Sequence, residues 1–481
     1  MLAVAGLAGL AVGCGPGSPG VSAPENPLKI PPLLRPRRSS DGVRRFHLNL
    51  RAGRTEFLPG KKAATWGVNG SYLGPTLRAS RGDRVAIRVA NRVDEATSLH
   101  WHGMRVPAPM DGGPHQLIAP RGVWSPEWTI DQPAASTWYH PHPHGRTALH
   151  VYRGIAGMFI IDDRDAPDLP RAYGVDDIPL IIQDPTFRPD GSLDESAVTR
   201  GRFGFTGDSI LVNGTYEPVL RVRAARVRFR LLNASGSRVY QVGFGDGRRF
   251  HLIATDVGLL RAPLEVGRVK LSPGERAEVL VDFAPGDRVT LNSVGERHKG
   301  AAPIEKGDFD LLAIAAAGRL APAAPMPSRL SDSGPIEPPP GARVRRFVLG
   351  GLEINGRTMD MARIDEVVPA GATEIWEVHN TAFAHTFHIH GVGFSVLDVD
   401  GAPPFPQLRG LKDTVFVHAN GKLRLAVTFG EHADPANPYM YHCHILRHED
   451  QGMMGQFLVV EPGTESQVPT QLSGMTHHRH G

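Results

Sequence analysis

Short apolar segments alternate with turns along most of the chain. Residues 157–161 and 178–182 are nearly continuous apolar runs, and residues 84–91 alternate between apolar and polar side chains. Runs of this length, bounded by Gly and Pro, are typical of β-strands that are buried on both faces or on one face. The pattern predicts a β-rich chain.

One sequence unit occurs three times. Each copy has an aliphatic residue followed by Asn-Gly, and an alternating strand pattern comes after it. The copies are residues 68–70 with 84–91, residues 212–214 with 226–233, and residues 354–356 with 374–380. A repeated unit of this kind indicates a repeated architecture. We therefore expect an all-β fold of three β-sandwich domains.

Changes in composition divide the chain into six segments. They are a signal-like or lipobox-like segment with a flexible Pro-rich tether (1–43), a first domain (44–165), a second domain (166–318), a Pro-rich linker (319–342), a third domain (343–462) and a polar tail containing histidines (463–481). A length of 481 residues suits several domains of ordinary size. For the tail, a disordered end is the simpler interpretation and metal scavenging is the alternative.

The formal net charge of +4 is small for this length, and no block of Lys or Arg occurs. A nucleic-acid partner is therefore not indicated. The chain has only two cysteines, Cys14 and Cys443, so it contains no disulfide framework. We expect a monomer.

An apolar segment, residues 2–12, precedes Cys14. It is too short to span a bilayer, which takes about 20 residues, and it suits the core of a signal peptide. Small residues before Cys14 resemble a bacterial lipoprotein cleavage box, although no basic residues precede the apolar segment. We expect export to the periplasm or cell envelope, with or without a lipid anchor on Cys14.

The strongest chemical signal lies near the C-terminus. Cys443 stands between His442 and His444, and His448 and Met453 follow five and ten residues after the thiol. A thiolate, imidazoles and a weak thioether are the ligands of blue copper sites. On an extended strand alternate side chains face opposite sides. Cys443 would then face one metal while its two neighbours face another.

His-X-His pairs recur in four short clusters. The pairs are His100 and His102, His140 and His142, His388 and His390, and His442 and His444. On a strand, each pair points two imidazoles to the same side. Eight imidazoles divide as two, three and three, enough for three copper ions, and His385 remains to complete the blue site. Four copper ions match the four electrons that convert dioxygen to water.

These clusters resemble the four signature segments of the multicopper oxidases, the family of laccases and bacterial copper-efflux oxidases. The likeness extends over residues 44–461 and is most specific in residues 100–113, 138–147 and 411–454. The resemblance implies three cupredoxin-like Greek-key sandwiches with a trinuclear copper cluster between the first and third. No ligand cluster falls in the second domain.

The resemblance also implies a role for each ligand. His100 and His388 would bind type 2 copper, His102, His140 and His444 one type 3 copper, His142, His390 and His442 the other, and His385, Cys443 and His448 type 1 copper with Met453 as axial neighbour. Glu449 and Asp111 match positions that relay protons. From residues alone, Glu449 would be a solvated carboxylate and Asp111 a turn residue.

The expected reaction couples four one-electron oxidations to the reduction of dioxygen. The resemblance implies a small donor that docks at an exposed edge of His448 or His385 and passes its electron through Cys443. Phenols, aromatic amines and Cu(I) are the candidate donors. Thr381 and Phe383 replace the acid and methionine expected before the third cluster, which weakens the case for Cu(I).

Other metal chemistries fit the pattern less well. A structural zinc site needs one closed set of four ligands, an electron carrier needs only the fourth cluster with His385, and a two-copper nitrite reductase does not need both histidines beside Cys443. A non-catalytic copper-sequestering envelope protein is the alternative from another class. Storage needs neither a thiolate relay nor a dioxygen site. The remaining histidines have no partner at ligand spacing, and we expect them to be structural or surface residues.

Overall fold

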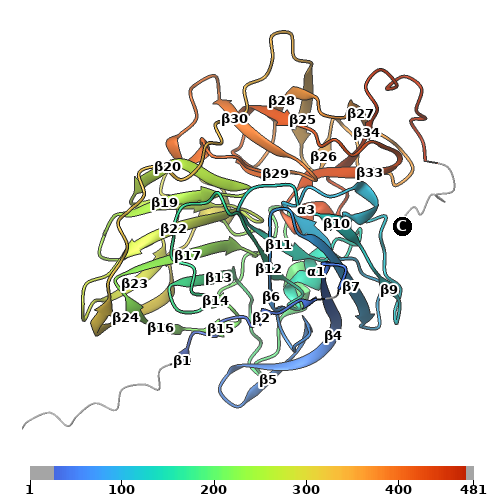
Figure 1. The fold of residues 1–481 in the computed structure, drawn as a ribbon. Coiled ribbons are helices and arrows are strands. Elements are labelled where there is room, and N and C mark those ends of the chain that lie inside the picture. Colours follow the sequence, from blue (N-terminus) through green and yellow to red (C-terminus); the bar gives the residue numbers. More distant parts are fainter. Residues whose placement is uncertain (1–25, 39, 473–481) are drawn as a thin grey trace, which may run out of the picture.

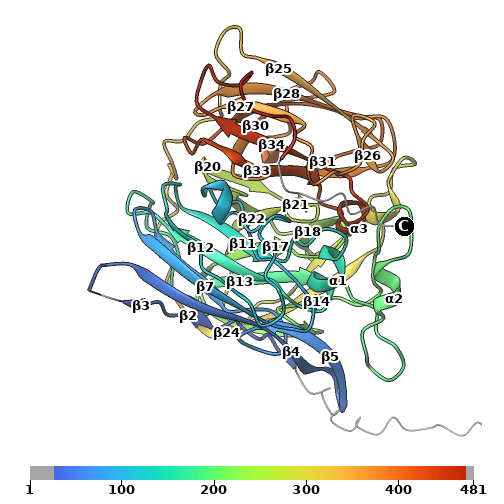
Figure 2. The ribbon, with the colours of Figure 1, turned by 90° about the vertical axis from the view of Figure 1, so that its right-hand side faces the viewer.

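The computed structural model describes residues 26–38 and 40–472. The apolar segment 2–12, Cys14 and the histidines of the tail lie outside these residues. Within them, no helix is both long and apolar enough to cross a membrane. Figures 1 and 2 show three strand-rich bodies that follow one another in the sequence, with few and short helices. The all-β prediction is confirmed.

Two sheets form the first body. One contains β3 (Arg37–Arg38), β4 (Arg44–Leu58), β5 (Lys61–Val68), β7 (Arg84–Arg92), β9 (Val123–Trp124) and β10 (Glu127–Thr129), and the other β2 (Leu33–Leu34), β6 (Thr76–Ser80), β8 (His100–His102), β11 (Ala135–His140) and β12 (Gly157–Asp162). The helices are η1 (Ala108–Met110) and α1 (Thr147–Tyr152). The alternating face of β7 contributes Val85, Ile87 and Val89 to the core between the sheets.

The second body also consists of two sheets, of six and seven strands. One contains β1 (Asn26–Pro27), β16 (Pro218–Ala224), β18 (Tyr240–Phe244), β21 (Arg268–Leu271), β23 (Arg288–Ser293) and β24 (Phe309–Ala321), and the other β13 (Asp177–Gln183), β14 (Leu211–Val212), β15 (Thr215–Tyr216), β17 (Arg226–Asn233), β19 (Phe250–Thr255), β20 (Gly258–Val266) and β22 (Arg276–Asp282). Two short helices, α2 (Glu195–Val198) and η2 (Pro303–Glu305), lie in its loops.

The third body completes the chain. One sheet contains β25 (Val344–Gly350), β26 (Glu353–Ile354), β28 (Thr373–Asn380), β30 (Gly393–Val399) and β32 (Lys422–Thr428), and the other β27 (Glu366–Pro369), β29 (His385–Ile389), β31 (Thr414–Val417), β33 (Asp434–Cys443) and β34 (Met454–Val460). Its helices are η3 (Pro406–Leu408) and α3 (Leu446–Asp450). Trp376 and Phe347 pack at the centre of its core.

The sequence repeat is a repeat in structure. Asn69, Asn213 and Asn355 all have positive φ, between 51° and 58°, a conformation that Asn tolerates better than most residues. Each side-chain oxygen accepts a hydrogen bond from the backbone of an earlier strand, at Asn49, Ile181 and Val348 respectively. In each body, therefore, the same kind of turn is hydrogen-bonded to an earlier strand.

The expected tether and linker are more ordered than their proline content suggests. Residues 26–38 contain three short strands, and β1 pairs in parallel with β16 of the second body. In the linker, Leu330 is buried and its N–H donates to the carbonyl of Arg261 at 2.8 Å. Both segments lie against the domains, because their scattered apolar side chains are buried there and isolated backbone groups find partners.

The histidine clusters lie on facing strands of two bodies. In the first, β8 and β11 pair with His100 opposite His140. In the third, β29 and β33 pair with His388 opposite His442. Figure 2 shows α3, which follows β33, beside α1 of the first body. The fold thus brings clusters separated by about three hundred residues to one interface.

Candidate metal centre

The alternation of side chains along β33 separates two groups of ligands. The sulfur of Cys443 lies 3.4 Å from Nδ1 of His385 and 3.4 Å from Nδ1 of His448. His442 and His444 point to the other side, into a cluster of imidazoles. Cys443 is buried, and its N–H donates to the carbonyl of Met453 at 3.1 Å. Met453 is also buried beside this site.

Eight imidazoles from β8, β11, β29 and β33 and their flanking residues meet between the first and third bodies. Nε2 of His442 lies 3.2 Å from Nε2 of His142 and 3.1 Å from Nε2 of His390. Three groups have ligand atoms within 4.8 Å of one another: His102, His140 and His444; His142, His390 and His442; and His100, His102 and His388. The first two groups contain the residues of the predicted type 3 sets, and the third contains the predicted type 2 pair together with His102.

Buried nitrogens without partners show that this cluster suits metal ions. Nε2 of His100, His140 and His388 and Nδ1 of His102 are buried and have no hydrogen-bond partner. Burial, reinforced by neighbouring imidazoles, lowers the pKa of His102, His140 and His388 well below the usual value. A buried imidazole nitrogen with a free lone pair is costly unless a hydrogen-bond donor or a cation meets it, and such lone pairs are what a metal cation binds.

The other ring nitrogens are held by the surrounding protein. Nδ1 of His100 lies 2.9 Å from the carbonyl of Asp111, and Nδ1 of His388 lies 2.8 Å from the carbonyl of Asp413. A carbonyl can only accept, so Nδ1 carries the hydrogen in both rings and Nε2 is left with its lone pair. This arrangement orients metal-ligating histidines in many proteins.

Comparisons with known proteins agree with this geometry. Family models described as multicopper oxidase match residues 49–166, 178–294 and 334–463. A Staphylococcus aureus protein named multicopper oxidase mco is 34% identical over 446 residues, which cover 91% of this chain and 93% of the relative. The chain belongs to the multicopper oxidase family. The predicted cupredoxin-like domains are confirmed with it.

Other relatives carry different names. Cell division protein FtsP of Escherichia coli K12 is 38% identical over 468 residues, covering 94% of this chain and 96% of the relative. Among solved structures, a laccase-like multi-copper oxidase CueO from Ochrobactrum sp. has a TM-score of 0.82 and 38% identity, covering 90% of this chain and 100% of that one. Family membership therefore does not by itself decide the activity.

Asp111 lies where the multicopper oxidase resemblance places a proton relay. Its Oδ2 is 2.8 Å from Nδ1 of His390 and its Oδ1 is 3.4 Å from Nδ1 of His100. Burial by itself would raise the pKa of Asp111, but the imidazoles of His100 and His390 outweigh it and lower that pKa below the usual value. Asp111 directly follows η1 as its C-terminal cap, so it has a place in the turn as well as beside the cluster.

Glu449 lies against the same cluster from α3. One carboxylate oxygen is 3.3 Å from Nδ1 of His142 and the other is 3.3 Å from Nδ1 of His442. It is buried, so the solvated carboxylate expected from residues alone is excluded. Burial and the neighbouring Asp450 carboxylate raise the pKa of Glu449 well above its usual value.

Three further residues at the cluster are absent from the sequence prediction. The carboxylate of Asp413 lies 3.1 Å from Nε2 of His102, and the hydroxyl of Thr414 lies 3.1 Å from the same nitrogen. Both terminal nitrogens of Arg276 donate hydrogen bonds to the carboxylate of Asp413, at 2.7 and 2.6 Å. Asp413 directly precedes the apolar strand β31, and Arg276 begins the apolar strand β22. A charged residue at such a position is a signal that could have drawn attention to both.

The thiol depends on a cation for its charge. Burial raises the pKa of Cys443 to about 12, so the metal-free site holds a neutral thiol at physiological pH. A bound metal cation stabilises a thiolate strongly enough to reverse this preference. A bound cation and the thiolate would therefore stabilise each other in this buried site.

The predicted exposed edge of the type 1 histidines is wrong. His385 and His448 are both 0% exposed. A loop of the second domain covers His448, and the carbonyl of Arg202 accepts a hydrogen bond from Nε2 of this ring at 3.0 Å, while Phe383 packs against His385. No pattern of residue types predicts this contact, because it is made by backbone.

Histidines that were not predicted as ligands lie beside polar side chains outside the metal centre. His150 lies 3.0 Å from the hydroxyl of Thr97, and His115 lies 2.8 Å from the amide oxygen of Gln456. His144 is half-buried beyond its cluster. Among the residues that the structure describes, none of these three belongs to a group of ligand atoms.

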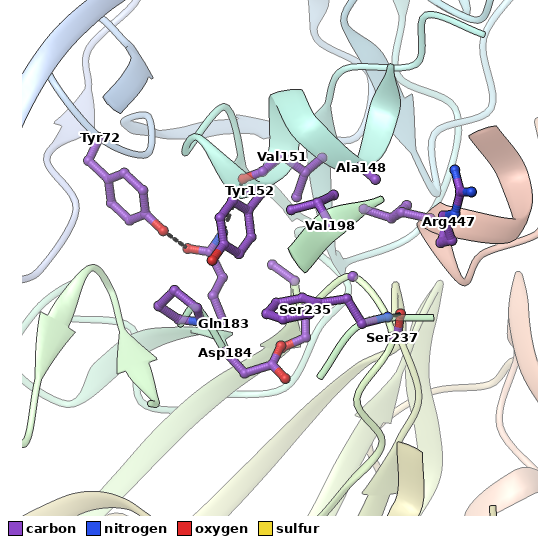
Figure 3. Close-up of a pocket in the computed structure, with 15 residues that line it drawn as sticks. Tyr72, Ala148, Val151, Tyr152, Gln183, Asp184, Val198, Ser235, Ser237 and Arg447 are labelled. Atoms are coloured by element: carbon purple, nitrogen blue, oxygen red, sulfur yellow. Dashed lines mark hydrogen bonds between the residues drawn. The ribbon is translucent and has the colours of Figure 1, made fainter. Parts of the chain in front are cut away.

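A small pocket lies behind α3. Figure 3 shows that Tyr72, Tyr152 and Gln183 point into it from one side, with Arg447 of α3 on the other. The hydroxyl of Tyr72 donates to the amide oxygen of Gln183 at 2.9 Å. This pocket contains none of the predicted ligands, so it is separate from the metal centre.

Proposed function

We propose that this multicopper oxidase takes single electrons from a small donor at a type 1 site and uses four of them to reduce dioxygen to water. His385, Cys443, His448 and Met453 would hold the type 1 copper. The eight His-X-His imidazoles would hold one type 2 and two type 3 ions, in the groups given above. Copper supplies reversible one-electron redox chemistry at both sites when bound.

The arrangement of β33 carries this proposal. Cys443 faces His385 and His448, while its peptide neighbours His442 and His444 face the imidazole cluster. An electron that arrives at the sulfur therefore has a covalent path of one residue to either side. Glu449 and Asp111, each beside imidazoles of the cluster, are placed to move the protons that water formation consumes.

The test is dioxygen uptake by the copper-loaded protein. We expect Cys443→Ser to abolish uptake and the blue absorption while circular dichroism stays that of the folded chain. His251→Ala is a matched control, since His251 lies outside the ligand groups and is half-buried; it should keep both properties. Dioxygen uptake by Cys443→Ser with an organic donor would refute electron transfer through Cys443.

The surroundings of the type 1 site favour an organic donor over Cu(I). The ring of Phe383 lies 4.9 Å from that of His385 and 5.3 Å from that of His448. An aromatic ring binds planar organic molecules by stacking, whereas Cu(I) prefers sulfur ligands. The Ochrobactrum relative is described as having oxidase activity towards lignin model compounds and lignosulfonate. Rates with a phenol, Fe(II) and Cu(I), compared at equal protein concentration, decide the donor.

A second candidate is a role in cell division, which the name of the Escherichia coli relative suggests. Copper sequestration without catalysis is a third, and four bound copper ions without dioxygen uptake would support it. Rescue of a division defect by the Cys443→Ser chain would show that division does not need the oxidase. If the unaltered chain rescues the defect and Cys443→Ser does not, the role in cell division depends on the oxidase activity.

Export is proposed on the apolar segment 2–12 only. A periplasmic or envelope oxidase would meet copper and dioxygen outside the cytoplasm. Cell fractionation of the full-length chain, with and without Cys14→Ala, separates cytoplasmic, soluble exported and lipid-anchored forms.

A further inference from the structure

A segment of the second domain closes over the type 1 site. Residues 199–206, here called the cap, follow α2 and pass over α3 of the third domain. Nε2–H of His448 donates to the carbonyl of Arg202, while Nδ1 of the same ring faces Cys443. The cap therefore occupies the edge of His448 through which a donor would otherwise make contact.

Two aromatic rings connect the surface of the cap to both imidazoles. Phe203 is 39% exposed, and its ring meets Phe383 edge to face at 5.0 Å. Phe383 packs against His385 and His448 on its other side. A molecule resting on Phe203 and Phe383 would therefore lie one ring away from the type 1 ligands.

The cap is fixed to the domains on its inner side. The N–H of Phe205 donates to the hydroxyl of Ser237 at 2.9 Å. Gly204 has a φ of +86°, and a Cβ there would come within 2.2 Å of the Ser237 hydroxyl. Val198, at the end of α2, and Arg447 line the small pocket beneath it, as Figure 3 shows. The outer face of the cap is thus presented in a defined position.

That outer face carries positive charge. The guanidinium of Arg202 lies 5.3 Å over the ring of Phe383 and forms no ion pair with any residue in the described part of the chain. An exposed aromatic ring, Phe203, beside the exposed guanidinium of Arg202 favours a ligand that is both planar and anionic.

We propose that Arg202 and Phe203 determine donor specificity, by docking aromatic anions on the Phe203–Phe383 pair and away from direct contact with His448. This inference rests on the proposed function, because it assigns the type 1 site to His385, Cys443 and His448. In each event one aromatic anion loses one electron and becomes a neutral radical, and the type 1 site gains that electron. No bond forms or breaks, and no proton moves, since the donor is already deprotonated.

The experiment measures binding without turnover. The copper-loaded full chain is titrated calorimetrically, under anaerobic conditions, with 2-naphthalenesulfonate and with its neutral analogue 2-naphthalenesulfonamide. Neither probe is oxidised. We expect the sulfonate to bind about tenfold more tightly than the sulfonamide, because only the sulfonate carries the charge that Arg202 attracts.

Side-chain variants locate the binding. Phe203→Ala should weaken the binding of both probes about tenfold, in line with the usual contribution of an aromatic contact. Arg202→Gln should weaken the binding of the sulfonate alone. Both variants keep the backbone carbonyl that holds His448. Phe405→Ala, at a ring that is 64% exposed elsewhere on the third domain, and Arg88→Gln, at an exposed site on β7, are the matched controls.

The outcomes separate this inference from the oxidase itself. Unchanged binding in Phe203→Ala and Arg202→Gln, or equal affinity for the two probes, would overturn the docking site even if dioxygen uptake is fast. Selective loss of sulfonate binding in Arg202→Gln would support it whatever the rate of uptake. With oxidisable phenolates, the same variants should raise KM and leave kcat nearly unchanged.

Discussion

Single asparagines set the same backbone turn in all three domains. In the third, Asn355 has a φ of 54°, its side-chain oxygen accepts from Val348 N–H at 2.7 Å, and its amide donates to the carbonyl of Arg346. The side chain thus closes the loop between two strands while the backbone takes a conformation that a β-carbon disfavours.

Two substitutions at Asn355 separate these contributions. Asn355→Gly removes the side-chain hydrogen bonds but keeps the positive φ at no steric cost, and it should lower the free energy of unfolding by about 1–2 kcal/mol. Asn355→Ala also strains the backbone and should lower it further, by about 1 kcal/mol. Urea unfolding checks the order, and equal stability of the two variants would contradict it.

Glu449 gives a direct test of the proposed proton relay. Its carboxylate lies 3.3 Å from the imidazole of His142, which follows β11, and 3.3 Å from that of His442 in β33. We expect Glu449→Gln to bind the same number of copper ions and to reduce dioxygen uptake about 10²- to 10⁴-fold, the usual range for lost acid–base catalysis. Glu461→Gln, at an exposed site just after β34, is the control. Loss of copper from Glu449→Gln would indicate a structural role instead.

The ligands could be predicted from the sequence because their spacing is local. Cys443 and its two neighbours need only a strand to separate them into two sites, and the structure provides that strand. The carbonyl of Arg202 could not be predicted, since every residue has a carbonyl and the contact joins residues 246 positions apart. The link from Asp413 to Arg276 also joins residues far apart in the sequence, so their charges could draw attention to them but could not show that they pair.

Among the elements, α3 shows how a short helix is held in place. It has five residues, too few to be stable by itself. The carboxylate of Asp450 at its end accepts from the backbone N–H groups of Thr147 and Ala148 in α1, at 2.7 and 3.1 Å. This contact between the first and third domains fixes the helix that carries His448 and Glu449.

Strands β17 and β22 hold a buried ion pair that makes stability depend on pH. Glu278 of β22 accepts from Arg228 and from Arg230, the latter at 2.8 Å. Burial alone would raise its pKa, but the two guanidinium groups outweigh burial and lower the pKa of Glu278 to about 2. The unfolded chain has the ordinary value of about 4.5. Its ionisation therefore stabilises the fold above about pH 4.5, and this contribution is lost as the pH falls towards 2.

Substitution tests this contribution. Glu278→Gln should lower Tm at pH 7 and flatten the decline of Tm between pH 5 and pH 3. Glu265→Gln, at a side chain that is 57% exposed, should follow the unaltered protein at every pH. A decline as steep in Glu278→Gln as in the unaltered chain would show that other carboxylates dominate acid unfolding.

At the scale of the whole molecule, the second domain supplies no predicted ligand but joins the two that do. Arg276 of β22 is 0% exposed. Its Nε donates to the carbonyl of Ser136 in the first domain at 3.1 Å, and its terminal nitrogens donate to Asp413 in the third. Asp413 contacts His102. One guanidinium therefore ties three domains together beside the imidazole cluster.

This junction predicts that a residue of the second domain controls metal content. Arg276→Met fills a similar volume but leaves the Asp413 carboxylate buried without a cation, a change that costs about 3–5 kcal/mol in comparable pairs. A carboxylate without its partner would also compete for the nitrogen of His102. We expect fewer than three copper ions at the cluster by metal analysis, with the blue absorption of the type 1 site retained.

Arg226→Met is the control for that prediction, because Arg226 pairs with the exposed carboxylate of Asp282 on the same two strands, far from the cluster in register. Loss of the blue absorption together with the cluster copper would mean that Arg276→Met unfolds the third domain as a whole. Full copper content in Arg276→Met would show that the cluster needs only the two domains that hold its ligands. The expected result, a selective loss, would make the second domain a structural requirement for the cluster, since the side chain of Arg276 contacts both of the domains that hold the predicted ligands.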